Sequence, residues 1–382
     1  MIKTKILVSF LGKGNYREVV YRIDGHEYRS KLSIWVIKEA LSPEKIYVIG
    51  TKDSRWDLLQ ELNLKDIKQI IIPPGRNEKE LWEIIDIISH EVALESSDVI
   101  FDITHCFRSI PLFLVVLIKF LKFFNTNVDI DKILYGYLDE SSRESMIVDL
   151  APLVELLELI DAVNSFERYG DPQDICSLIS NKEKKYRKEF PRSLREIKRI
   201  LIEIGAIIKM TYVPRLNKVA EKMDNALQKL EEEQARNEVN IYFKSLTYMF
   251  DRFKMMARRF KIDQDWQAQL EVARWYNENR HPSQALLTLR EALITYGCSR
   301  ENKDPYNYKN RARVEEEYRD KRMHSDESIY KLWNKVIDYR NKTAHILTGA
   351  ASKINPESAI KKVRKLIKEA FEILGAEDVG EN

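Results

Sequence analysis

The sequence contains little cysteine, little net charge and no long apolar run. Its three cysteines, Cys106, Cys176 and Cys298, are far apart and odd in number, which fits neither a disulfide framework nor a zinc site. A formal net charge of +3 is too small to indicate a nucleic-acid-binding protein by itself, so any basic surface must be local. No apolar run is long enough to cross a bilayer, and the N-terminus lacks a signal-peptide pattern. We therefore expect a cytoplasmic protein with no membrane partner.

The first half of the chain alternates buried-strand and amphipathic-helix patterns. Apolar runs at 5–10, 45–50, 69–72 and 98–103 predict strands, and the segments 32–41, 53–62, 78–92 and 112–124 have helical period. Asp24-Gly25 marks a hairpin, and 132–138 with 145–150 predicts a closing antiparallel pair. The sequence has no GxGxxG motif to suggest a dinucleotide cofactor. The pattern is typical of an α/β domain with a mainly parallel sheet.

The second half has a different organisation. After about residue 151 the strand patterns stop, and long charged helices with apolar stripes follow. Asn355-Pro356 predicts the start of the last helix, because proline suits a first turn that needs no donor. With 382 residues there is room for two domains. We expect an α/β domain over residues 1–168 and an all-helical region over 169–382.

Two loops of the α/β domain are candidate ligand sites. The first expected strand is followed by the glycine-rich turn 11–16. The expected strand over 98–103 is followed by Thr104, His105 and Arg108, which precede a helix. Open α/β sheets bind ligands at the carboxyl ends of their strands, and a helix N-terminus favours anions. The alternatives are a plain tight turn at Gly12-Lys13-Gly14 and a satisfied turn histidine at His105.

The helical half contains one candidate for RNA chemistry. Arg340 and His345 follow an amphipathic run, with Asn341 between them. An arginine clamps a phosphate and a histidine exchanges protons near neutral pH, which together can cut RNA without a metal. Five residues on an ideal helix turn two side chains roughly 140° apart, so a dimer that joins two copies is the easier geometry. The alternative is a surface arginine beside an incidental histidine, since Arg274/His281 and Arg319/His324 have similar spacing.

Taken together, these residues resemble those of the CRISPR-associated CARF–HEPN ribonucleases, accessory effectors of type III systems. The resemblance rests on 11–16 with Tyr21, on Thr51 with Trp56, on 102–111, and on the Arg-polar-x3-His pattern of 340–345. These four features span both halves of the chain. Cys106 stands where the family usually has glycine.

The resemblance implies a Rossmann-like CARF sensor domain that dimerises and binds cyclic oligoadenylate, most commonly cyclic tetra-adenylate, as an allosteric activator. The ligand-binding positions that it implies are Gly12, Lys13, Gly14, Asn15, Tyr16, Thr51, Thr104, His105, Cys106, Phe107 and Arg108.

For the helical region the resemblance implies a HEPN domain, a metal-independent endoribonuclease that acts on single-stranded RNA. Arg340 would hold the scissile phosphate, His345 would act as general base or acid, and Asn341 would orient the substrate or the histidine. Paired domains in a homodimer or higher oligomer would form one site, with a 2′,3′-cyclic phosphate and a 5′-hydroxyl as products. No cofactor or metal is expected.

Two other functions remain open. The helical half could be catalytically silent, which would make the protein a ligand-responsive regulator. Alternatively, the first domain could degrade the cyclic oligoadenylate, with help from Lys13, Thr51 or Thr104.

Overall fold

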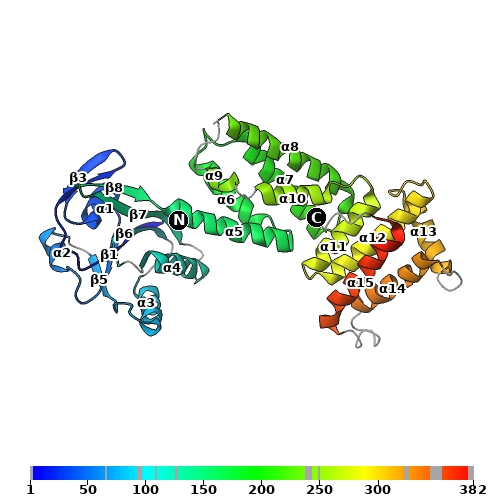
Figure 1. The fold of residues 1–382 in the computed structure, drawn as a ribbon, viewed down its shortest axis with the longest axis horizontal. Coiled ribbons are helices and arrows are strands. Elements are labelled where there is room, and N and C mark those ends of the chain that lie inside the picture. The colour runs from blue at the N-terminus through cyan, green and yellow to red at the C-terminus, as the bar shows by residue number, and fades with distance from the viewer. Residues whose placement is uncertain are drawn as a thin grey trace. The chain divides into compact units, whose positions relative to one another are not determined.

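The structure of the chain is a computed structural model that describes residues 3–64, 67–92, 97–107, 110–124, 128–236, 243–247, 250–321, 327–344 and 355–376. The chain consists of two compact units, Met1–Leu157 and Glu158–Asn382. The division falls within helix α5 (Ala151–Tyr169), and the boundary expected after residue 168 lies at the far end of this helix (Figure 1). We call the two parts the α/β unit and the helical unit.

Five parallel strands form the centre of the α/β unit: β1 (Thr4–Leu11), β4 (Lys45–Gly50), β5 (Ile67–Ile71), β6 (Ser97–His105) and β7 (Asp129–Asp139). Their order across the sheet is β7-β6-β1-β4-β5, and each neighbouring pair is parallel. Strands covered on both faces are apolar nearly throughout, which explains why the pattern of the sequence identified them. The predicted parallel α/β architecture is confirmed.

Three further strands extend the sheet beyond β7. The next strand, β8 (Glu144–Asp149), is antiparallel to β7, as predicted for the closing pair. Beyond it lie β2 (Val19–Ile23), parallel to β8, and β3 (His26–Ser30), antiparallel to β2. Asp24 and Gly25 join β2 to β3 with φ of 48° and 81°, the left-handed values of a two-residue hairpin turn. This confirms the predicted hairpin and places it at the edge of the sheet.

The sheet has its topological switch point between β1 and β6. From β1 the chain moves outward through β4 to β5, and then returns to the other side of β1 to form β6 and β7. The carboxyl ends of β1 and β6 are therefore neighbours, and Leu11 pairs with His105. The β2–β3 hairpin separates β1 from the next helix of the chain, whereas a helix is the next element after β6, and these two helices pack in the cores on opposite faces of the sheet. A crevice therefore opens between the loops that follow the two strands.

Helices cover the two faces of the parallel strands (Figure 1). On one face, α1 (Ser33–Leu41) and α2 (Asp57–Glu61) contribute to a core that includes Leu7. On the other face, α3 (Glu78–Glu91) and α4 (Ile110–Phe124) enclose a second core. The helix expected over 53–62 is shorter because its first residues form a turn that bonds to the end of β1.

The helical unit contains no strand among its described residues, which confirms the all-helical prediction for this half. Its helices after α5 are α6 (Gln173–Lys185), α7 (Arg192–Lys209), the 3-10 turn η1 (Val213–Arg215), α8 (Leu216–Ala235), α9 (Lys244–Thr247), α10 (Phe250–Phe260), α11 (Asp265–Glu278), α12 (Pro282–Arg300), α13 (Tyr308–Lys321), α14 (Ser328–Ala344) and α15 (Pro356–Leu374).

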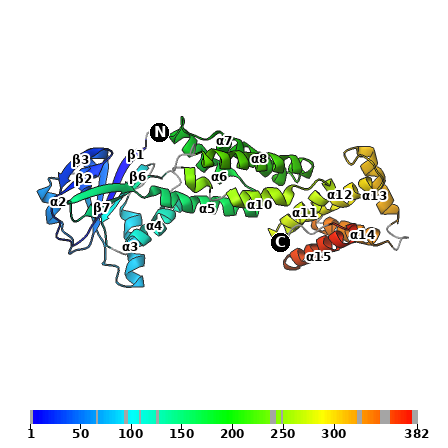
Figure 2. The same ribbon diagram turned by 45° about the horizontal axis from the view of Figure 1, so that its top comes forward.

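Helices α11, α12, α14 and α15 pack together at the C-terminal end of this unit (Figure 2). The Asn355 side chain accepts hydrogen bonds from the backbone of Glu357 and Ser358, so it caps α15 as predicted. His281 occupies the N-cap position of α12, before Pro282. None of the described helices is long and apolar enough to cross a membrane.

Candidate functional site

A buried carboxylate organises the loops at the switch point. Asp102, near the end of β6, is 0% exposed, and its Oδ2 accepts hydrogen bonds from Ser9 Oγ at 2.8 Å and Ser33 Oγ at 2.7 Å. Its Oδ1 accepts the backbone N–H of Thr104 at 3.1 Å. A buried charge is stable only when it is bonded in this way. Asp102 thus ties together β1, β6 and the start of α1, which are the elements that carry the candidate ligand loops.

His105 lies beside this carboxylate and is fixed by three neighbours. Its Nε2 accepts the backbone N–H of Ser33 at 3.2 Å and lies 3.2 Å from the hydroxyl of Tyr21. The ring of Tyr16 packs edge-on against it, with ring centroids 4.4 Å apart. Burial lowers the pKa of His105 below its ordinary value, against the opposing attraction of Asp102. The imidazole is therefore neutral near pH 7, with its proton on Nδ1.

The two glycines after β1 make room for Tyr16. A Cβ on Gly12 would lie 2.8 Å from both the His105 carbonyl oxygen and the Tyr16 hydroxyl. A Cβ on Gly14 would lie 2.8 Å from Cε1 of the Tyr16 ring. Neither glycine has a positive φ. The Gly-Lys-Gly turn therefore needs glycine for this close approach, and it brings the tyrosine ring against His105.

The loop after β4 supports the same strand end. The backbone N–H of Thr51 donates to Ser54 Oγ at 2.9 Å, and this hydroxyl donates to the Leu11 carbonyl at 2.7 Å. Trp56 Nε1 donates to the Thr51 carbonyl at 2.9 Å. Thr51 is only 3% exposed. Thr51 and Trp56 therefore hold the loop against β1 in this structure, rather than lining its open side.

An open cleft of about 670 Å³ lies beside these loops. Four of the predicted ligand residues line it: Asn15, Tyr16, Thr104 and His105. Thr104 Oγ1 accepts the backbone N–H of Gly136 at 2.9 Å, which links the end of β6 to β7. Clefts of this size suit a ligand larger than a mononucleotide base.

The cleft also has side chains that the sequence did not indicate. Three cations line it, Arg17, Lys31 and Arg143, together with the carboxylates Glu18 and Glu140. The aromatic rings of Tyr135 and Tyr137, 39% and 63% exposed, lie on the β7 side. Cations beside exposed rings suit phosphates and bases.

The cations and tyrosines of the cleft come from elements far apart in the sequence, the loop before β2, the end of β3, and the β7–β8 hairpin. Only the alternation of tyrosines along β7 could have indicated part of this surface.

The remaining predicted ligand residues have other positions. Lys13 Nζ lies 2.5 Å from Asp53 Oδ2, and this contact lowers the pKa of Asp53. Cys106 and Phe107 pack against the core beneath the α3–α4 face. Arg108 lies outside the described residues. Gly12, Lys13, Gly14, Thr51, Cys106 and Phe107 are described residues that do not line the cleft.

Cys106 fits its turn without backbone strain, because it has no positive φ. Glycine is therefore not required there by backbone conformation. Burial raises the pKa of its thiol to about 12, so the thiol is protonated near neutral pH. The residue acts as a small apolar group under the turn.

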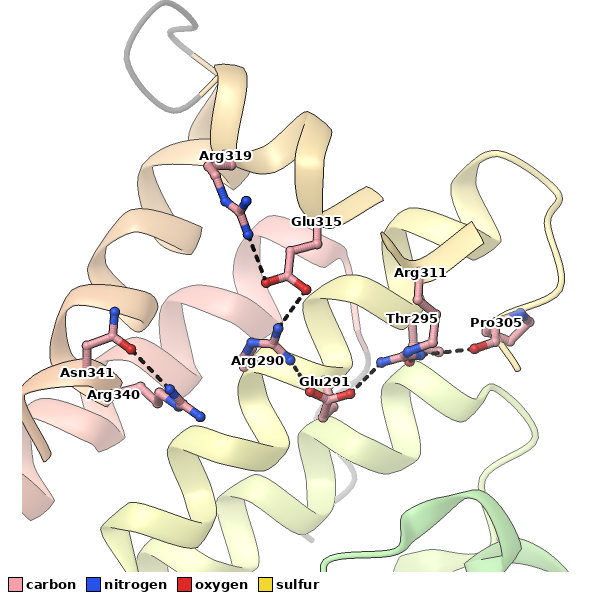
Figure 3. A network of polar contacts seen from close by, with 9 residues as sticks. All are labelled: Arg290, Glu291, Thr295, Pro305, Arg311, Glu315, Arg319, Arg340 and Asn341. Atoms are coloured by element: carbon pink, nitrogen blue, oxygen red, sulfur yellow. Dashed lines mark hydrogen bonds and ion pairs between the residues drawn. The ribbon is translucent and has the colours of Figure 1, made fainter. Parts of the chain in front are cut away.

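The second candidate site lies at the end of α14. Arg340 Nη1 donates to Asn341 Oδ1 at 3.1 Å (Figure 3). The Thr343 hydroxyl donates to the Arg340 carbonyl. The Arg340 Nε is buried, and none of the described residues forms a hydrogen bond with it. His345 lies outside the described residues. The amphipathic run before the motif is buried as predicted, with Trp333 and Tyr339 3% and 4% exposed.

Among the described residues, Arg340 differs from its basic neighbours in having no counterion. Lys342 pairs with Asp338 at 2.6 Å, and Lys335 pairs with Glu369 at 2.5 Å. In the part of the chain that the structure describes, no carboxylate pairs with Arg340. Nor do three His, Cys, Asp or Glu side chains of the described residues come together as a metal ion would need.

The fold and cleft of the first unit define a class. This unit is a doubly wound α/β domain with a cationic, aromatic cleft beside its switch point, the place at which open α/β folds bind their ligands. Residues 6–139 match the family model described as CRISPR system endoribonuclease Csx1, CARF domain. Residues 155–262 match the model described as CRISPR-associated protein MJ1674, second domain.

One curated relative matches nearly the whole chain. The chain is 26% identical to the CRISPR-associated protein MJ1674 of Methanocaldococcus jannaschii, in an alignment that covers 95% of this chain and 66% of that relative. The chain thus spans just under two thirds of that relative. By these matches the chain is similar to CRISPR-associated proteins, with an N-terminal CARF domain followed by an all-helical region. Arg340 lies beyond both matched segments.

Proposed function

We propose that this protein is an endoribonuclease of CRISPR defence that acts on single-stranded RNA, needs no metal and is activated by cyclic oligoadenylate. The activator binds the CARF cleft, and the helical unit carries a HEPN-type site at Arg340, Asn341 and His345. The observation that carries the proposal is the half-buried guanidinium of Arg340, which a neighbouring amide orients and no described carboxylate neutralises.

The cleft supports the first part of this proposal. A cyclic oligoadenylate repeats one phosphate and one adenine, so its recognition needs cations beside aromatic or hydrogen-bonding groups. Arg17 and Arg143 offer the charges, while Tyr135 and Tyr137 offer exposed rings. A ligand with rotational symmetry is best held by two copies of such a cleft, which favours a homodimer or a higher oligomer.

The end of α14 supports the second part. Arginine holds a phosphate through a planar fork of donors, and the buried Nε of Arg340 still lacks an acceptor. The terminal Nη groups of this fork can donate to a phosphate oxygen, which would gain stabilisation as negative charge builds up during cleavage. His345 would remove the proton of the 2′-hydroxyl or protonate the leaving oxygen. The reaction leaves a 2′,3′-cyclic phosphate and a 5′-hydroxyl.

Activation follows from the geometry of a composite site. Two copies of Arg340 and His345 must align, and a misplacement of about 1 Å can cost about a hundredfold in rate. The activator shifts the population toward the aligned arrangement, to the extent of its differential affinity for the two states.

The decisive experiment is an RNA cleavage assay on the full chain with a panel of cyclic oligoadenylates and EDTA present. We expect cleavage with one ring size, cyclic tetra-adenylate, and products that end in a 2′,3′-cyclic phosphate. His345→Ala abolishes cleavage and keeps activator affinity. Failure of every activator to elicit cleavage would leave a ligand-responsive regulator, and disappearance of the activator itself would indicate a ring nuclease.

A further inference from the structure

A second cavity, of about 410 Å³, lies within the helical unit. Its walls come from the 211–214 segment, the first turns of α11, the middle of α12 and the segment that leads into α13. Neither Arg340 nor Asn341 lines it. Its volume falls in the range of small-molecule sites.

One wall of this cavity contains an amide with unmet hydrogen-bonding capacity. Gln269 is 6% exposed, and its buried Oε1 has no hydrogen-bond partner in the part of the chain that the structure describes. Buried acceptors in native proteins are nearly always bonded, because leaving one unpaired is costly. The amide can exchange its oxygen and nitrogen by rotation about the last side-chain bond. It therefore offers an acceptor to a group that enters the cavity.

Two donors of the cavity, Arg311 and Tyr306, already have partners within the protein, and Figure 3 shows those of Arg311. Arg311 Nη1 donates to Thr295 Oγ1 at 3.1 Å and to the Pro305 carbonyl at 3.0 Å, while its Nη2 lies 2.5 Å from Glu291. The Tyr306 hydroxyl donates to Asp265 Oδ2 at 2.6 Å.

The groups of the lining that can still bind a ligand are mostly acceptors, and they belong to Asp265, Gln269 and the Thr288 hydroxyl. Two carboxylates against one guanidinium also give the lining a slight negative charge, which disfavours an anion. A ligand must therefore bring donors.

The other walls are flat and apolar. Val213, Pro214 and Leu287 line them, and the rings of Tyr212 and Tyr306 are 52% and 59% exposed. Thr211, at the rim, has φ of 53°, a conformation that a β-branched residue rarely adopts. Apolar walls beside rings fit a planar heterocycle, and the acceptors opposite fit an edge that carries an amine.

We propose that this cavity binds an unpaired nucleobase with an exocyclic amine, adenine or cytosine, of the RNA on which the protein acts. Gln269 and Asp265 accept hydrogen bonds from the amine, and a tyrosine ring stacks on the base. Uracil and hypoxanthine place a carbonyl oxygen at the position of the amine, where it would face the carboxylate of Asp265, which only accepts hydrogen bonds. The inference rests on the proposed action on RNA and adds a base preference to it.

The test is equilibrium binding to the full chain carrying His345→Ala, so that no cleavage intervenes. The probes are a short labelled uridine oligonucleotide and the same molecule with one central cytidine, adenosine or inosine, at fixed salt. We expect cytidine to bind roughly three- to tenfold more tightly than uridine, and adenosine likewise more tightly than inosine. Equal binding of all four probes would overturn the proposal.

Two variants show whether the preference comes from this cavity. Gln269→Met removes the acceptor at similar volume and should abolish the preference, whereas Gln267→Met, on the same helix but outside the cavity, should keep it. Gln269→Glu retains oxygen acceptors and should also keep the base preference. Loss of the preference in a folded Gln269→Glu chain would contradict the proposal even where Gln269→Met does not fold. A preference that survives in folded Gln269→Met would place the recognition elsewhere.

The outcomes separate this inference from the proposed function. A base preference that depends on Gln269, in a protein that cleaves no RNA under any activator, would support base binding in this cavity and would refute the proposed endoribonuclease activity. Cleavage without base preference in binding would do the reverse. A further outcome is that cyclic tetra-adenylate displaces the labelled RNA from the chain that keeps Gln269 but not from the chain with Gln269→Met. This result would show that the cavity binds an adenine of the activator and not a base of the RNA, contrary to the proposal.

Discussion

Asn341 Oδ1 accepts a hydrogen bond from Nη1 of Arg340, 3.1 Å away, so the residue that follows the arginine sets the direction of its guanidinium. Adjacent side chains on an α-helix point about 100° apart, and the long arginine must bend toward its neighbour to make this contact. The sequence had suggested that Asn341 orients the substrate or the histidine. The contact found in the structure is with the arginine.

Asn341→Ala should therefore lower the rate of RNA cleavage by roughly ten- to a hundredfold, because a freely rotating guanidinium is seldom in place. Asn341→Asp should lower it at least as much, since a carboxylate would neutralise Arg340. Single-turnover cleavage at saturating activator measures both effects. Lys335→Ala, which removes a surface ion pair on the same helix, is the control and should leave the rate unchanged. An undiminished rate in Asn341→Ala would deny the amide this role.

Arg143 provides a test of the CARF cleft. It lines the cleft from the β7–β8 turn, and its φ of 57° is held by the hydrogen bond from its N–H to the Asp139 carbonyl, 2.9 Å long. Arg143→Ala should weaken the binding of cyclic tetra-adenylate by roughly ten- to a hundredfold, because charge-assisted hydrogen bonds contribute about 1.5–3 kcal/mol. Titration calorimetry on the full chain measures this.

Arg55→Ala is the matched control for Arg143→Ala. Arg55 pairs with Asp57 at 2.7 Å in the same unit and does not line the cleft. Both variants remove one positive charge, so a general electrostatic effect would weaken binding equally. Equal losses would exclude a direct contact of Arg143 with the ligand.

Local pattern was sufficient to place the two main loops of the site. The apolar runs of β1 and β6 end at Gly12 and Thr104, and in a parallel sheet both carboxyl ends lie at one edge. Asn15, Tyr16, Thr104 and His105 were found in this way.

The cations of the cleft were missed because they depend on long-range pairing. The strand β2 pairs in parallel with β8, and this pairing places the β2–β3 hairpin beside the β7–β8 turn. Arg143 lines the cleft because of this arrangement. No periodicity in the sequence encodes that neighbour relation. The roles of Thr51 and Cys106 were also beyond sequence reasoning, because burial decides them.

At His105 one of the two sequence interpretations is confirmed and the other stays a prediction. A satisfied turn histidine and a ligand contact had been alternatives. In the structure Nε2 is bonded internally to the Ser33 N–H, while the residue also lines the cleft. One ring nitrogen serves the fold, and Nδ1 keeps a proton to donate.

The same contact predicts a pH dependence of stability. Burial lowers the pKa of folded His105 below 6.5, and only an unprotonated Nε2 can accept the Ser33 N–H. As pH falls below about 6.5, His105 takes up a proton in the unfolded chain but not in the folded chain. The free energy of unfolding therefore decreases until the pH reaches the lowered pKa of the folded His105.

We expect His105→Gln to unfold less pH-dependently than the wild type between about pH 8 and about pH 5, because glutamine does not titrate. Urea unfolding of the full chain at each pH measures the difference in slope. Identical slopes for the two chains would mean that His105 gains its proton as easily folded as unfolded. His26→Gln, a change at an exposed histidine of β3, is the control and should keep the wild-type slope.

The Gly14–Tyr16 contact predicts a change of sign in a double-mutant cycle. In the wild-type background, Gly14→Ala should destabilise the protein by about 1–3 kcal/mol, because the new Cβ would lie 2.8 Å from the Tyr16 ring. In a Tyr16→Ala background that ring is gone. Since Gly14 has no positive φ, the same change should then stabilise by about 0.4–1 kcal/mol through the unfolded chain.

Gly12→Ala is the matched comparison for this cycle. Its Cβ would lie 2.8 Å from the backbone carbonyl oxygen of His105 as well as from the Tyr16 hydroxyl, and the carbonyl stays when the tyrosine is removed. Gly12→Ala should therefore destabilise in both backgrounds, while Gly14→Ala destabilises in only one. Unfolding free energies of the six chains decide the matter. A Gly14→Ala cost that persists without the ring would show that the turn itself, not its approach to Tyr16, requires glycine.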